Sequence, residues 1–239
     1  ILKWINGKLE FQVTLQKKKN WITTYAKFFI DKFGFIIVTV KEEGQAHLVF
    51  RAMNSTGEGL TGGELIKSML FYKSRSISGF NEDIGWSNIS NILDSTRTGS
   101  TDIISQFFYD YGRSIGMKNK GKKTKLSSNA RSVFEAFEQH CMNMSNTEFK
   151  QFFNSLKSEA ENYHHIQFPP PSVVNWRDVP KERKNDLVDL RNMGYRQTRQ
   201  VLLSARRYLD DQQFSRVIQV IITMIVRVNI CFGVSPAKK

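Results

Sequence analysis

The sequence is poor in cysteine and has no long uninterrupted apolar run. It holds two cysteines in 239 residues, too few for the disulfide framework of a small secreted domain, so we expect a reducing, cytoplasmic setting. No stretch has the pattern of a secretory signal. The most apolar segment, 217–234, contains Arg227 and two further polar residues, which argues against a membrane span. These features predict a cytoplasmic protein that has no membrane partner.

Metal-binding and nucleotide-binding motifs are also missing. The four histidines and two cysteines show neither a paired C-x-x-C nor an H-E-x-x-H spacing, so the sequence predicts no metal site and nominates no catalytic residue. The adjacent His164 and His165 are more simply polar residues at a helix end. No glycine loop of the Walker or Rossmann type occurs. Gly62 and Gly63 precede a helix, where they suit either turn geometry or an anion site.

Positive charge is what the chain has in excess. Its 35 Lys and Arg outnumber its 22 Asp and Glu, which gives a net charge of +13. The excess lies in 1–40, in 176–239 and in a lysine-rich loop, and segregated charge suits a polyanion such as DNA because bound phosphates release counterions. A solubilising surface is the alternative. The candidate nucleic-acid-binding residues of the loop are Lys118, Lys120, Lys122, Lys123 and Lys125.

An arginine-rich helix predicted at 196–209 is the second candidate binding surface. At 100° per residue, three of its arginines lie near one face, and their forked guanidinium donors suit phosphate oxygens. The alternative is a solvated face whose arginines pair with the adjacent Asp210 and Asp211. With one arginine just upstream, the candidate set is Arg191, Arg196, Arg199, Arg206 and Arg207.

Helical periodicity dominates from Trp21 onward, so we expect a mostly α, multi-helix fold. The exception is 35–40, a β-branched run that indicates one short buried strand, which needs partners from outside this chain. The triple proline that begins at Pro169 is a stiff spacer. We therefore expect three parts: a helix and strand at 1–41, a helical subdomain at 42–168, and a C-terminal helical subdomain at 169–239.

Local signals mark several helix ends. Thr61 with Glu64 and Ser145 with Glu148 have the spacing of a capping box, in which two side chains reciprocally bind the first free amides of a helix. Gly194 ends a helix predicted to begin at Lys181.

Buried groups can be predicted as well. Cys141 continues the apolar face of its helix, which indicates a structural cysteine. Residues 214–232 are apolar nearly all round, so we expect a central buried helix. Within it, Arg227 would need a structural partner.

The segment from Phe50 to Ser68 reads FRAMNSTGEGLTGGELIKS. It resembles a motif of the GmrSD-type restriction and defence proteins, domain-of-unknown-function family 262, whose pattern is like L-N-S-x-G-x-x-L-S/T-x-x-D/E-L-I/L-K-N. Met53 stands for the usual leucine, and Ser68 stands for the usual asparagine. The preceding helix, strand and helix agree with the family pattern too. The matching residues are Asn54, Gly57, Leu60, Thr61, Glu64, Leu65 and Lys67.

The resemblance implies that a larger protein carries the chemistry. Family members have a head similar to ParB and sulfiredoxin, with a D-G-Q-Q-R motif linked to nucleotide hydrolysis, and many add an HNH-type nuclease domain. They act in modification-dependent restriction of foreign DNA. Neither motif occurs here, and the chain begins at Ile1 without an initiator methionine. We therefore expect a fragment that lacks the head, and the strand at 35–40 would complete a small sheet of that head.

The same resemblance implies that this chain is the helical portion of a nucleotide-dependent anti-phage restriction protein. It would supply DNA and phosphate contacts and packing rather than catalysis. The full-length protein would be an NTPase or endonuclease that uses a nucleoside triphosphate and a divalent metal, with no cofactor in this fragment. Its partners would be DNA, the N-terminal head, a C-terminal nuclease domain and, in a homo-oligomer, a second copy.

The motif also implies candidate residues for a nucleotide pocket, Asn54, Thr56 and Lys67. A purely local role, in which they hold the shape of the motif loop, is the alternative. The alternative function for the whole chain is a non-catalytic helical scaffold or protein-interaction domain. Its basic charge would then serve solubility or partner binding.

Overall fold

A computed structural model of the chain describes residues 15–32, 60–75, 77–94, 102–119, 125–170 and 176–232. In these ranges it contains nine α-helices, and the only β-type pairing is an isolated antiparallel bridge between Lys118 and Lys125. The mostly α fold predicted from the sequence is therefore confirmed. The expected strand at 35–40 lies outside the described residues. None of the described helices has the length and apolar character needed to cross a membrane.

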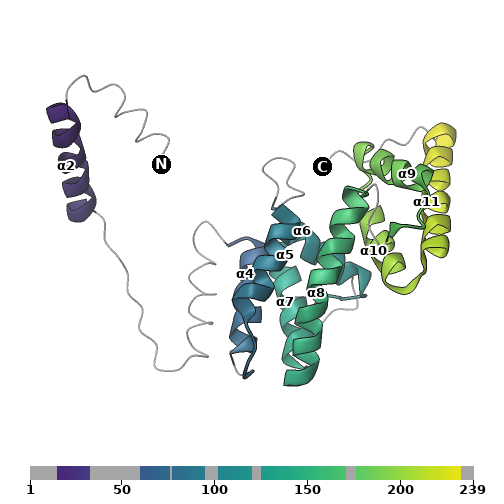
Figure 1. Cartoon of the computed structure of the whole chain (residues 1–239), viewed down its shortest axis with the longest axis horizontal. Coiled ribbons are helices and arrows are strands. Elements are labelled where there is room, and N and C mark those ends of the chain that lie inside the picture. The colour runs from purple at the N-terminus through teal and green to yellow at the C-terminus, as the bar shows by residue number, and fades with distance from the viewer. Residues whose placement is uncertain are drawn as a thin grey trace. The chain divides into compact units, whose positions relative to one another are not determined.

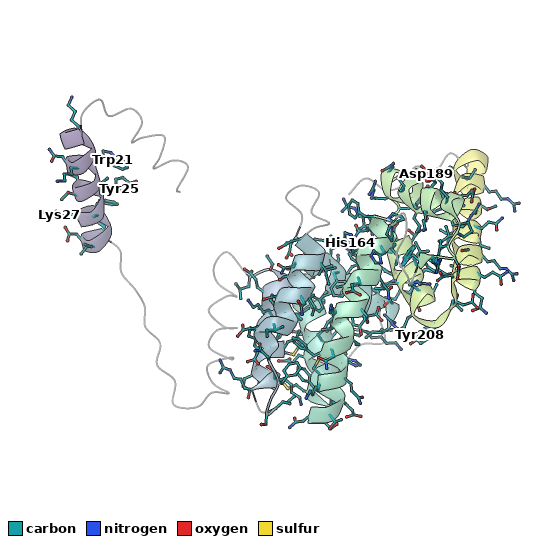
Figure 2. The ribbon with its side chains drawn as sticks, viewed as in Figure 1. Trp21, Tyr25, Lys27, His164, Asp189 and Tyr208 are labelled. Atoms are coloured by element: carbon teal, nitrogen blue, oxygen red, sulfur yellow. The ribbon has the colours of Figure 1, made fainter. Side chains whose placement is uncertain are left out.

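The chain divides into two compact units, Ile1–Ala46 and His47–Lys239. The described part of the first unit is a single helix, α2 (Leu15–Lys32). On this helix the rings of Trp21 and Tyr25 stack with their centroids 4.7 Å apart, and Lys27 projects from the opposite side (Figure 2). Helix α2 begins six residues before the predicted start at Trp21.

The second unit is built on five packed helices (Figure 1). Helix α4 packs against α7, α5 packs against α8, and α6 contacts all four of the others. Aromatic side chains fill the space between them, with Phe107, Phe108 and Phe137 fully or almost fully buried. The five helices are α4 (Gly62–Ser74), α5 (Glu82–Asp94), α6 (Ile103–Ser114), α7 (Ala130–Met142) and α8 (Asn146–Gln167).

Both predicted capping boxes are present. The amide of Glu64 donates to Thr61 Oγ1 at 3.3 Å, and the Glu64 carboxylate accepts the Thr61 amide at 2.8 Å. The same reciprocal pair joins Ser145 and Glu148 at the start of α8. These short-range contacts explain why the starts of α4 and α8 are predictable from sequence.

Three further helices complete the second unit: α9 (Lys181–Asn192), α10 (Thr198–Tyr208) and α11 (Asp211–Phe232). Helix α10 contacts α6 and α8 as well as α11, and α9 contacts α8 and α11. The helices on the two sides of the triple proline therefore share packing surfaces. In Figure 1 the three lie together beside the upper end of α8.

The expectation that the last helix is central and buried is wrong. Helix α11 packs against α9 and α10, while the side chains of Val220 and Met224 are 56% and 60% exposed. Arg227 is exposed too and needs no buried partner. The apolar pattern indicates which residues favour burial, but it does not indicate how many helices pack against α11 and cover them.

Candidate functional site

A cleft lies where the end of α8, the helix α9 and the start of α10 meet. It is partly open to solvent, and leucine and isoleucine side chains form its apolar part. Among the described residues that line it, none is acidic. We call it the arginine cleft, and its polar lining consists of Gln167, Arg191, Tyr195, Arg196, Thr198 and Arg199. Figure 2 labels His164 on α8 and Asp189 on α9, one on each of two helices that flank it.

A tight turn after α9 brings the three arginines of the cleft together. The Gly194 amide donates to Arg191 O at 3.0 Å, and the Tyr195 amide donates to Leu190 O at 3.1 Å, which is the Schellman pattern of a helix end. Gly194 has a φ of +79°, where a side chain would be strained. The sequence prediction that Gly194 ends this helix is therefore confirmed. The chain then reverses into α10, so Arg196 and Arg199 come to line the same cleft as Arg191.

Arg191 is held in place by its neighbours on α8. Its Nη1 donates to the backbone oxygen of Gln167 at 2.8 Å, and its guanidinium carbon lies 4.7 Å from the centre of the Phe168 ring. A guanidinium has five N–H donors, and one of them makes this bond. The stacking and the hydrogen bond orient the group and leave donors for a ligand.

Arg196 and Arg199 differ in how far they are committed. Arg196 is exposed, and its side chain has no hydrogen-bond or ion-pair partner among the described residues. Arg199 is half-buried, and its Nη1 lies 3.4 Å from the hydroxyl oxygen of Tyr163. The Thr198 hydroxyl already donates to Tyr195 O at 2.6 Å, so it offers a ligand no proton.

Gln167 is the residue of the cleft that sequence reasoning missed. Its side chain is only 5% exposed, yet its Nε2 has no hydrogen-bond partner within the described part of the chain. A buried N–H group without an acceptor costs free energy. No sequence signal marks Gln167, because its burial depends on how α8, α9 and α10 pack together.

A buried polar cluster lies behind the cleft on α6, α8 and α10. The Asp110 carboxylate accepts hydrogen bonds from Tyr163 Oη at 2.9 Å, from Gln106 Nε2 at 3.1 Å and from Gln200 Nε2 at 3.0 Å. Burial raises the pKa of Asp110, although these bonds and the charge of Arg199 lower it in part. The cluster ties Arg199 to the core and so fixes one side of the arginine cleft.

Arg206 and Arg207 both form internal ion pairs, and only Arg206 pairs with an aspartate named in the alternative interpretation. Arg206 Nη1 lies 2.6 Å from Asp211 Oδ1, and the Arg206 side chain is only 9% exposed. Arg207 donates to both oxygens of Glu159 on α8, at 2.5 and 2.8 Å. Because both guanidinium groups are directed into internal ion pairs, they do not form an outward phosphate-binding row with Arg199.

Two of the five loop lysines are described. Lys118 and Lys125 are exposed and face each other across the antiparallel bridge. Asn119 closes the base of the loop, because its side chain donates to Lys125 O at 3.0 Å and accepts from the Ser127 amide at 3.0 Å. Lys120, Lys122 and Lys123 lie outside the described residues.

The candidate nucleotide-pocket residues are only partly visible. Asn54 and Thr56 lie outside the described residues. The Lys67 ammonium lies 5.3 Å from the Phe71 ring centre and 5.8 Å from that of Trp86, so it covers aromatic surface on α4 and α5.

The glycine pair at the start of α4 has a packing role. The Gly63 amide donates to Ser105 Oγ at 2.6 Å, and an added Cβ there would lie 2.7 Å from Ile104 Cγ2. Turn and packing geometry therefore account for this glycine, and its amide is already occupied.

The cysteine and histidine side chains have structural surroundings. Cys141 is buried, as predicted, and burial raises the pKa of its thiol to about 12. His164 stacks on Phe168, His165 meets Trp176 edge-on, and burial lowers the pKa of both imidazoles. The described residues contain no group of three or more His, Cys, Asp or Glu side chains that could hold a metal ion.

Comparison with known proteins gives no further guide. No protein-family model, no curated protein and no solved structure matches the chain.

Proposed function

We propose that this chain is the helical part of a GmrSD-like, nucleotide-dependent restriction protein and that it contributes contacts to DNA phosphates rather than catalysis. One observation carries the phosphate-binding part of the proposal: Arg191, Arg196 and Arg199 line a single cleft that has no acidic residue in its described lining. The family assignment rests on the motif at 50–68 and on the helix, strand and helix predicted before it.

The electrostatics of the cleft favour an anion. Each guanidinium is permanently charged and offers paired donors that match two phosphate oxygens. An anion that enters the cleft would meet three such residues in its lining. The chain's net charge of +13 adds long-range attraction for a polyanion. Exposed Lys118 and Lys125 give a second basic surface of the same sign.

Salt-dependent DNA binding tests the proposal. Fluorescence anisotropy with a labelled duplex should give an affinity that falls steeply as salt rises. The triple variant R191A/R196A/R199A should bind more weakly at every salt concentration. If each arginine contacts one phosphate, the slope of log K against log salt should become shallower by roughly 2.7, since each lost contact accounts for about 0.9.

A charge-matched control separates the cleft from net charge. The variant R131A/K150A/K157A removes the same three charges from exposed positions on α7 and α8 that do not line the cleft. It should keep most of the wild-type affinity and slope. Equal losses in the two triple variants would mean that only overall charge matters, and this result would reject a role for the cleft.

The exposed face of α11 favours a second candidate function, a protein-interaction domain. Arg216, Val220, Met224 and Arg227 follow one another at helical spacing and are all exposed. An apolar strip between two arginines matches an amphipathic segment with acidic flanks. In a pull-down, wild type should capture a synthetic peptide of this kind and V220S/M224S should not. Equal capture by wild type and variant would reject this function.

A further inference from the structure

We propose that the arginine cleft is a binding site for a single terminal phosphate group, a phosphate monoester, and that Gln167 is the donor that recognises it. This inference deepens the proposed function and rests on it only for the source of the phosphate. The ligand chemistry is shared by a 5′-phosphorylated DNA end and a free nucleoside monophosphate. Two independent features point to it, the three arginines that line the cleft and the unpartnered buried amide.

The unpartnered amide identifies the kind of group that is missing. Gln167 Nε2 is an N–H donor, so only an acceptor atom can satisfy it. It is only 5% exposed and lines the same cleft as the three arginines, with no acceptor for it among the described residues. An anion that enters the cleft would supply an oxygen to this donor and neutralise the guanidinium charge at once.

The depth of the amide separates a terminal phosphate from one inside a strand. An internal phosphate is joined to sugars on two sides and presents two free oxygens. A terminal phosphate is joined on one side only, presents three oxygens and carries a charge of about −1.5 to −2 at neutral pH. Because Gln167 is nearly covered, a phosphate that is joined to only one sugar can reach its amide more easily than a phosphate inside a strand.

Four of the side chains that line the cleft carry N–H donors. Arg191 is oriented by Phe168 and by the Gln167 backbone oxygen, and Arg199 lies beside Tyr163. Arg196 stands exposed at the turn and is free to close over a ligand once it enters. The site therefore combines two held guanidiniums, one adjustable guanidinium and one buried neutral donor.

Phosphate binding by the full chain tests the inference. Isothermal titration with inorganic phosphate, at constant ionic strength set by chloride, should show binding by wild type. Q167L should bind roughly tenfold more weakly or worse, because a hydrogen bond to a charged group is lost. Q167E should bind no phosphate, because its carboxylate would pair with the guanidinium groups of the cleft. R131A/K150A/K157A should bind phosphate like wild type.

Folding is controlled within the same set of variants. Q167L replaces a donor that has no described partner, so its thermal unfolding should match or exceed that of wild type. If wild type binds no phosphate, or if folded Q167L binds phosphate as tightly as wild type, the inference is overturned.

Oligonucleotides distinguish the source of the phosphate and separate the two proposals. A 5′-phosphorylated strand should bind wild type more tightly than the same strand with a 5′-hydroxyl, and Q167L should abolish that difference. A nucleoside monophosphate that displaces inorganic phosphate equally well would support the free-nucleotide source. Arginine-dependent DNA binding that ignores the 5′-phosphate would overturn this inference and leave the proposed function standing. Phosphate binding without any duplex binding would overturn the proposed contacts to DNA and leave this inference standing.

Discussion

The buried ion pair between Glu159 and Arg207 gives the sharpest test of how the second unit is held together. The side chains are 8% and 17% exposed, and two hydrogen bonds of 2.5 and 2.8 Å join α8 to α10. Glu159→Leu would leave a buried guanidinium without its carboxylate, a change that costs about 3–5 kcal/mol. Arg207 keeps a bond to Ser114 and a contact with the Tyr111 ring, so we expect the lower end, about 3 kcal/mol.

A double-mutant cycle separates the interaction from the desolvation of each charge. E159L/R207M replaces both charges with apolar groups of similar volume and should lie within about 1 kcal/mol of wild type, because no unpaired charge remains. Urea unfolding followed by circular dichroism gives the free energies. Glu161→Leu on the same helix is the control. Its pair with Lys157 is 4.0 Å long and about half exposed, so its loss should cost less than about 1 kcal/mol.

Two results would refute the reasoning on this pair. If E159L lost no more than E161L, the buried geometry would carry no energetic weight. If the double variant lost as much as the two single variants together, Glu159 and Arg207 would act independently.

Three further predictions concern titration and backbone conformation. Hydrogen bonds from Ser145 lower the pKa of Glu148, so the cap stabilises the fold above the unfolded pKa and weakens as pH falls through the lower folded pKa. S145A should raise the pKa of Glu148 in an NMR titration, and an unchanged pKa would contradict the prediction. Burial raises the pKa of Asp110, so the stability of the fold should decline as pH rises from about 4. D110N should remove this decline in the urea midpoints, and a decline that persists in D110N would contradict the prediction. Gly194 and Gly79 have φ of +79° and +70°, with nothing within 4 Å of an added Cβ. G194A and G79A should therefore each lower the free energy of unfolding by about 1 kcal/mol, but only G194A should weaken phosphate binding. Equal losses of phosphate binding in the two variants would contradict the role of the Gly194 turn.

Features set by neighbours in the sequence were predictable. The capping boxes at Thr61 and Ser145 and the helix end at Gly194 each depend on residues within five positions of one another. Such contacts form in the isolated segment, so the residue pattern alone predicts them.

Features set by distant contacts were not. The pair of Arg206 with Asp211 is local and was one of the alternatives in the sequence, but Arg207 pairs with Glu159, 48 residues away in the chain, and no local pattern indicates that contact. The exposure of α11 likewise depends on how many helices surround it. Gln167 acquires its role only when α8, α9 and α10 pack around it, and nothing in the local sequence reports that packing.

The most direct test of the central claim is an NMR spectrum of the arginine Nε–Hε groups, recorded as a 5′-phosphorylated oligonucleotide is added. The account predicts that the signals of Arg191, Arg196 and Arg199 shift together, while those of the ion-paired Arg206 and Arg207 stay in place. Shifts confined to Arg206 and Arg207, or no shift at any of the three cleft arginines, would contradict it.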